Sequence, residues 1–164
     1  MAEEFKRRKA EEEMEDRISN LPDGVINHIL SFLPTKSAVA TGRLSRRWRH
    51  LWQHLSVLNF IDDSYDFDDS DEFGEYERSK RFKRFVVLVN SVLLLLRNPR
   101  SIRKMSLDFD YSLYEDEFRQ YSVEAWVRAS IGPHLEELNL DLYHGPKFQL
   151  PQSLFTSTNL VSLR

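Results

Sequence analysis

Apolar side chains recur at helical spacing in the first apolar stretch of the chain, residues 22–32. Placed at 100° per residue, they gather on one half of a helix, about 180° wide, as Leu21, Phe32, Val25, Ile29, Pro22, Leu33, Ile26 and Leu30. A surface helix usually needs an apolar stripe only slightly wider than about 100° to cover its own core. The pattern therefore predicts a helix over residues 22–32 with apolar surface to spare.

Two shorter helices are expected to follow. Thr35 is placed to cap a helix over residues 36–41, which Gly42 ends. A third helix over residues 43–54 carries one compact apolar stripe, made of Leu44, Trp48, Leu51, Trp52 and then Leu55. Three short helices bury little surface, and the chain has no cysteine for a disulfide or a thiolate metal site. A partner protein is therefore expected to complete this module.

The pattern changes twice beyond the module. Residues 62–77 contain nine acidic and no basic side chains, which predicts a linker or surface loop. Residues 78–97 are predicted to form a helix, because Phe82, Phe85, Val86, Val89, Val92, Leu93 and Leu96 recur every three or four positions. The apolar run within it, residues 85–96, is shorter than the roughly 20 residues that cross a bilayer, so we expect a buried helix and no membrane partner.

Three later segments show the spacing of short strands. They read Ile102-x-x-Met105-x-Leu107-x-Phe109, Leu135-x-x-Leu138-x-Leu140-x-Leu142 and Leu160-x-x-Leu163. Each resembles the strand unit L-x-x-L-x-L of a leucine-rich repeat, in which alternate apolar side chains face a shared core. The units start 33 and 25 residues apart, so the repeats are irregular.

Composition narrows the function classes. The formal charge of −3 is too balanced for a protein that coats nucleic acid or membrane over its whole surface. The N-terminal residues lack the apolar core of a secretory signal, so we expect the nucleus or the cytoplasm. Residues 1–15 are interpreted as a charged leader, and their basic cluster, Lys6-Arg7-Arg8-Lys9, is a weak nuclear-import motif.

Candidate chemical sites are few. Asp66, Asp68, Ser70 and Glu77 have the spacing of a calcium loop, but Asp71 stands where the loop needs glycine. His50 and His54 lie one helical turn apart without a third ligand or a catalytic Glu. Phosphate-binding glycine loops and serine-nucleophile elbows are absent from the sequence. We therefore expect no catalytic residue, no cofactor and no metal.

The helical module resembles the F-box of plant F-box/leucine-rich-repeat proteins of the FBD type. The resemblance rests on three ordered blocks: Asp16-Arg17-Ile18-Ser19-Asn20-Leu21-Pro22-Asp23, Ile29-Leu30-Ser31-Phe32-Leu33-Pro34-Thr35-Lys36 and Leu44-Ser45-Arg46-Arg47-Trp48-Arg49-His50-Leu51-Trp52. Residues 126–127 and 150–155 resemble connectors of the same family. At Gly42 and Arg43 the chain departs from the family's usual small polar and apolar residues, which implies a different packing between the second and third helices.

The resemblance implies a function as well as a fold. The module would dock on the Skp adaptor of an SCF-type cullin–RING ubiquitin ligase, and the chain would be a non-catalytic substrate receptor that presents an unknown target. Matching positions give the contact or contact-supporting residues as Leu21, Pro22, Ile26, Ile29, Leu30, Leu33, Val39 and Trp48. The sequence does not separate those that form the module's own core from those that touch the adaptor.

The expected fold class is α plus α/β, a three-helix F-box module followed by an incomplete, solenoid-like leucine-rich-repeat region. The expected divisions are a leader over 1–15, the F-box over 16–60, an acidic linker over 61–77 and the start of the repeat region over 78–164. The last unit stops before its L-x-L half is complete and no polar cap follows. This suggests a fragment or a shortened family member.

Two other functions remain open at this stage. Arginines cluster on the expected third helix, as in a helix-turn-helix that inserts into a DNA major groove. The tryptophans of that helix and the acidic residues after it argue against DNA. A chain with few repeats could also act as a decoy that occupies the adaptor without a target.

Overall fold

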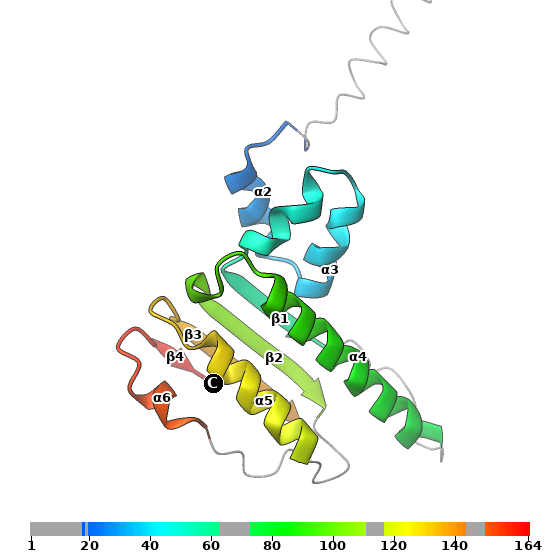
Figure 1. The fold of residues 1–164 in the computed structure, drawn as a ribbon, viewed down its shortest axis with the longest axis vertical. Coiled ribbons are helices and arrows are strands. Elements are labelled where there is room, and N and C mark those ends of the chain that lie inside the picture. Colours follow the sequence, from blue (N-terminus) through cyan, green and yellow to red (C-terminus); the bar gives the residue numbers. More distant parts are fainter. Residues whose placement is uncertain (1–17, 19, 63–72, 111–116, 144–149) are drawn as a thin grey trace, which may run out of the picture.

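The computed structural model describes residues 18, 20–62, 73–110, 117–143 and 150–164 (Figure 1). A helical module lies beside the end of a parallel sheet at which the strands begin (Figure 1). The expected leader, the cluster Lys6-Arg7-Arg8-Lys9 and the calcium-loop positions 66–71 lie outside the described residues.

The module consists of two α-helices and two 3₁₀ segments. They are α2 (Asp23–Leu30), α3 (Thr35–Ala40), η1 (Thr41–Arg43) and η2 (Trp48–His54). Pro22 and Pro34 precede the two α-helices, where a proline is tolerated because the first turn has no partner for its N–H. The first two helices predicted from the sequence are therefore confirmed.

Thr35 does not cap α3. It is the first residue of that helix, its side chain is buried, and its Oγ1 accepts a hydrogen bond from the backbone N–H of Asn59 at 2.7 Å. The prediction was wrong because Thr35 hydrogen-bonds to a strand far along the chain, a contact that local spacing cannot reveal.

The join after α3 also differs from the prediction. Gly42 does not end the helical path, because η1 continues through it. A Cβ at Gly42 would lie 3.3 Å from the backbone Cα of Arg49, so the absence of a side chain lets η1 pack closely on η2. The expected third α-helix over 43–54 is instead the 3₁₀ segment η2, and Leu44 is 70% exposed rather than part of its apolar stripe. Trp48, Leu51, Trp52 and Leu55 are buried as expected.

Four strands form one parallel sheet in the order β1-β2-β3-β4. They are β1 (Val57–Ile61), β2 (Lys104–Asp110), β3 (Glu137–Tyr143) and β4 (Ser162–Leu163). The three strand segments predicted from the leucine spacing are confirmed. Strand β1 was not predicted, although Leu55, Leu58 and Phe60 repeat the same spacing, and Leu58 and Phe60 pair with Met105 and Leu107.

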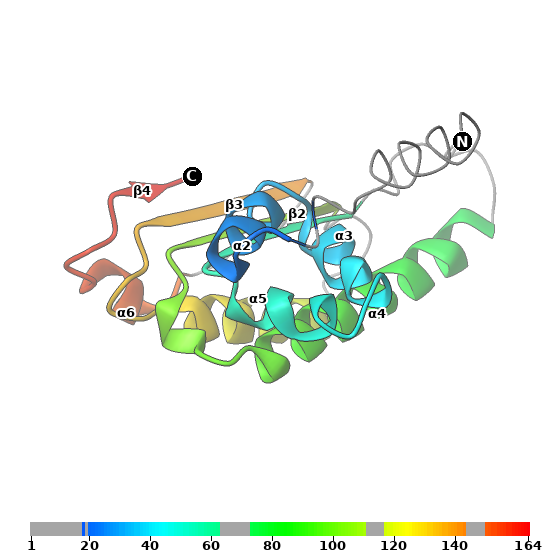
Figure 2. The same cartoon turned by 90° about the horizontal axis from the view of Figure 1, so that it is seen from above.

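Helices cover one face of this sheet (Figure 2). They are α4 (Phe73–Leu95), α5 (Glu117–Ser130) and α6 (Gln152–Phe155), and a 3₁₀ turn, η4 (Pro99–Ser101), precedes β2. Between the sheet and α4 and α5 lies an aromatic cluster of Phe60, Phe82, Phe85, Phe109 and Trp126. Helix α4 starts five residues before the predicted helix, within the segment expected to be a linker.

The α/β character of the second part is thus shown, whereas a leucine-rich-repeat solenoid is not. Four adjacent parallel strands with helices on one face are common to several α/β architectures. Within the described residues, no helix has the length and apolar character needed to span a membrane.

Candidate protein-binding surface

Helix α2 presents three different faces. At 100° per residue, Ile26, Leu30 and Leu33 share one direction, and Pro22, Val25, Ile29 and Phe32 lie next to it. The polar residues Gly24, Asn27, His28 and Ser31 occupy the third direction. The apolar half predicted from the sequence is therefore split in two by the fold.

The first face of α2 is the core of the module. Ile26 and Leu30 are almost completely inaccessible to solvent, and Leu33 packs against the same cluster. They lie in one continuous hydrophobic core with Trp48, Leu51 and Trp52 of η2. Each such buried side chain contributes about 1.5–3 kcal/mol relative to an exposed one.

The second face remains open. Val25, Ile29 and Phe32 are between 43% and 74% exposed, and Pro22 is exposed beside them. Ile18, four residues before Pro22 and also exposed, extends the three-and-four spacing upstream. We call Pro22, Val25, Ile29 and Phe32 the α2 stripe. Exposed apolar residues that line up on one helix face mark an interaction surface more often than single exposed ones do.

Arg47 ties the start of this face to the module. Its Nε and Nη2 atoms donate to Oδ1 of Asp23 at 3.0 and 2.6 Å, and Nη2 also donates to the backbone carbonyl of Leu21. A guanidinium holds its donors in a planar fork, so these contacts fix both the position and the direction of the helix start. The α2 stripe is thereby presented on a braced helix.

The predicted contact residues divide by burial. Ile26, Leu30 and Trp48 are buried core residues of this chain, and Leu21, Leu33 and Val39 are partly buried against that core. Pro22 and Ile29 are exposed and belong to the α2 stripe. Val25 and Phe32 are exposed stripe residues that the sequence reasoning did not select. The signal was their spacing of four and three residues from Ile29, but the sequence alone did not separate stripe from core.

The clustered arginines do not lie on a continuous α-helix that could serve as a recognition helix. Arg43, Arg46, Arg47 and Arg49 are exposed, yet residues 43–54 form two 3₁₀ segments and a connecting turn. A helix-turn-helix needs a continuous α-helix to enter the major groove. His50 and His54 are exposed, and no cluster of three possible metal ligands occurs among the described residues.

Comparison with known proteins identifies the module. Residues 18–60 match the F-box domain family. The chain carries an F-box domain. The match ends at Phe60, so it includes the first four residues of β1 and thus the first strand of the sheet. The resemblance read from the three sequence blocks is confirmed.

Relatives extend the similarity beyond the F-box. An F-box/LRR-repeat protein of Arabidopsis thaliana is 39% identical over 91% of this chain and 26% of its own length. An F-box/FBD/LRR-repeat protein of the same plant is 35% identical over 91% of this chain and 30% of its own length, and an FBD-associated F-box protein is 36% identical over 91% and 33%. The chain spans about a quarter to a third of the length of these relatives. No solved structure matches it significantly.

Proposed function

We propose that this chain docks on the Skp adaptor of an SCF-type cullin–RING ubiquitin ligase through the α2 stripe. F-box proteins are generally non-catalytic adaptor subunits, and the exposed stripe supports this role here. The core of the module is complete beneath it, so the exposed apolar groups of the stripe are not needed for the module's own packing. A partner that covers them gains hydrophobic free energy without disturbing that core.

We further propose that the sheet opens a leucine-rich-repeat region that presents a target protein. The repeated spacing of the four strands and the names of the relatives support this assignment. The ligase chemistry would then lie in associated subunits, and this chain would supply proximity between the target and the ubiquitin donor. Adaptor and target would bind to different parts of one continuous fold.

A matched pair of substitutions tests the docking surface. Val25→Asp places a charge in the stripe, and Val87→Asp places the same charge on an exposed valine of α4 that is 64% accessible. We expect Val25→Asp, alone or with Ile29→Asp, to abolish co-purification with the Skp adaptor, because burying a carboxylate against apolar surface is unfavourable. Val87→Asp should bind like the unmodified chain. Circular dichroism of both variants checks that they fold.

A salt titration separates adaptor docking from DNA binding. Binding through an apolar stripe should change little between 50 and 500 mM salt, whereas phosphate contacts weaken steeply as counterions are released. If Val25→Asp co-purifies with the adaptor at full strength, the stripe is not the docking surface. If the chain binds a DNA duplex and does not bind the adaptor, the proposed adaptor-docking function is wrong.

A further inference from the structure

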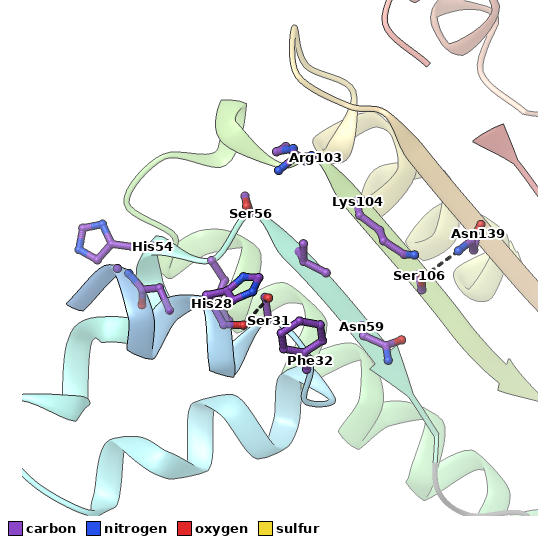
Figure 3. A pocket seen from close by; sticks show the side chains of 14 residues that line it. His28, Ser31, Phe32, His54, Ser56, Asn59, Arg103, Lys104, Ser106 and Asn139 are labelled. Atoms are coloured by element: carbon purple, nitrogen blue, oxygen red, sulfur yellow. Dashed lines mark hydrogen bonds between the residues drawn. The ribbon is translucent and has the colours of Figure 1, made fainter. Parts of the chain in front are cut away.

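A hollow lies beside the polar face of α2, away from the face that forms the module's core. This groove, with a volume of about 690 Å³, runs between the polar face of α2 and the face of the sheet that α4 and α5 leave open. Figure 3 shows His28 of α2 and Phe32, two residues after that helix, on one side, Lys104 and Ser106 of β2 on the other, and Asn59 of β1 between them. We call it the α2–sheet groove. Its volume lies within the roughly 300–1,000 Å³ typical of ligand sites.

Two cationic side chains, Arg103 and Lys104, line the groove together with the imidazoles of His28 and His54. No carboxylate is among the lining residues. Glu137 at the start of β3 and Glu136 just before it hold the two cations in place and offset part of their charge. Arg103 Nη2 lies 2.9 Å from Glu136 Oε2, and Lys104 Nζ lies 2.7 Å from Glu137 Oε2. The hydrogen bond from Arg103 lowers the pKa of the Glu136 carboxyl and raises the pKa of Arg103 itself, so both remain charged at neutral pH. A guanidinium has five N–H donors and an ammonium three, so each cation keeps donors for a further acceptor.

The floor and the helix side add groups that pair with a peptide backbone. Asn59, Ser106 and Asn139 stand at one register position across three strands, and Asn139 Nδ2 donates to Ser106 Oγ at 3.2 Å. From α2, the side-chain oxygen of Asn27 is buried and finds no hydrogen-bond donor among the described residues. A ligand N–H would satisfy this acceptor once the Asn27 side chain turns toward the groove. A simple anion carries only acceptors at its charged end, whereas a peptide carries both carboxylates and N–H groups.

We propose that the α2–sheet groove binds an extended acidic segment of a target protein. Side-chain carboxylates of that segment meet Arg103 and Lys104, and its backbone amides meet Asn27 and the row of Asn59, Ser106 and Asn139. Asp108 and Asp141, at the next outward register position, do not line the groove. They confine the acidic side chains of the ligand to the end at which the strands begin.

This inference rests on the proposed presentation of a target protein, but it does not depend on adaptor docking. The α2 stripe and the groove use different faces of α2 and share only Phe32 at their border. A substitution in one face should therefore leave the other function intact. A target segment in the groove would lie directly beside the adaptor, which would keep the target close to the assembled ligase.

Fluorescence anisotropy with defined peptides tests the proposal on the whole chain. The probe is a fluorescein-labelled decapeptide that alternates Glu and Gly, compared with the same peptide carrying Gln in place of Glu. We expect the Glu peptide to bind and the Gln peptide to bind at least about tenfold more weakly, because the charged contacts are lost. Arg103→Gln with Lys104→Gln should weaken the Glu peptide by about tenfold or more.

The control removes the same two charges elsewhere. Lys83→Gln with Arg84→Gln changes an exposed pair of cations on α4, outside the groove, and should change affinity less than about twofold. The proposal is overturned if this control loses as much affinity as the groove variant, or if the Glu and Gln peptides bind equally. It is also overturned if a single-stranded DNA of equal charge binds more tightly than the peptide, since the groove would then favour nucleic acid.

A blocking variant tests the location independently of charge. Gly24 lines the groove, and a Cβ added there meets no atom within 4 Å, so a side chain can enter without displacing the backbone. Gly24→Trp should prevent peptide binding, whereas Gly24→Ala should preserve it. Both Gly24 variants should co-purify with the adaptor. Val25→Asp should show the reverse pattern, binding the peptide but not the adaptor. Peptide binding that survives Gly24→Trp would place the site elsewhere.

Discussion

At the scale of single residues, Thr35 shows how one hydroxyl joins the helical module to the sheet. Its side chain is buried and accepts from the Asn59 N–H on the outer edge of β1. An edge strand carries unpaired backbone groups that can recruit another chain, and Thr35 satisfies one of them. The F-box helices thus cover the first edge of the sheet.

Replacing Thr35 by valine should destabilise the chain. Thr35→Val keeps the shape and leaves the Asn59 N–H without an acceptor, which should lower the free energy of unfolding by about 1–3 kcal/mol. Thr41→Val is the control, because its hydroxyl donates only to the Ala38 carbonyl within the same helical turn. Urea denaturation measures both. Equal losses of unfolding free energy in the two variants would mean that the hydrogen bond to Asn59 stabilises the chain no more than the local one to Ala38 does.

At the scale of elements, the α2 stripe depends on how the helix start is held. Arg47 and Asp23 are partly exposed, so their ion pair adds little stability, about 0–1 kcal/mol. Its effect is on position, because the same guanidinium binds the Leu21 carbonyl and the Asp23 carboxylate. A braced helix loses less conformational entropy when a partner binds.

Arg47→Ala should therefore weaken adaptor binding more than it weakens the fold. We expect a loss of affinity of several-fold with a change in melting temperature of only a few degrees. Arg46→Ala, one position away and also exposed, removes the same charge and should leave affinity nearly unchanged. Calorimetric titration with the Skp adaptor distinguishes them. Equal losses for the two arginines would point to overall charge instead of helix position.

At the scale of the whole molecule, the F-box and the sheet share one core. Leu58 and Phe60 lie in β1, directly after the module, and are buried in the same cluster as Trp48 and Trp126. Backbone hydrogen bonds add to this continuity, since Arg97 N donates to the Gln53 carbonyl and Arg103 N to the Ser56 carbonyl at 2.9 and 2.7 Å. The two parts are therefore expected to unfold together.

Phe60→Ala tests this coupling. Removing a buried phenylalanine should cost about 3–5 kcal/mol, and hydrogen exchange should accelerate equally in α2 and in β2. Leu94→Ala on the exposed side of α4 is the control and should have little effect. If α2 keeps its protection while β2 loses it, the F-box folds independently of the sheet.

Much of this architecture follows from local patterns. Helical spacing predicted α2 and most of α4, because one buried face repeats every three or four residues, whereas α3 was predicted from Thr35 and Gly42 as its end signals. The leucine spacing predicted β2, β3 and β4, since alternate side chains of a strand face one core. It missed β1, because Leu55, the first residue of this spacing, is also the last residue of the helical stripe, and Leu58 and Phe60 follow directly. The same stripe predicted an α-helix where the 3₁₀ segment η2 forms, and the backbone of η2 at Arg49 packs closely against Gly42.

The sequence by itself determined that α2 has more apolar surface than one core can use, since that follows from residue types and a fixed helical period. Only the tertiary structure decided which of these apolar residues pack into the core and which stay exposed. Ile26 and Leu30 face η2, whereas Val25 and Ile29 one position earlier do not. It also decided that the polar half of α2 lines a groove with Lys104 and Asn139, because these residues meet only when distant strands pair.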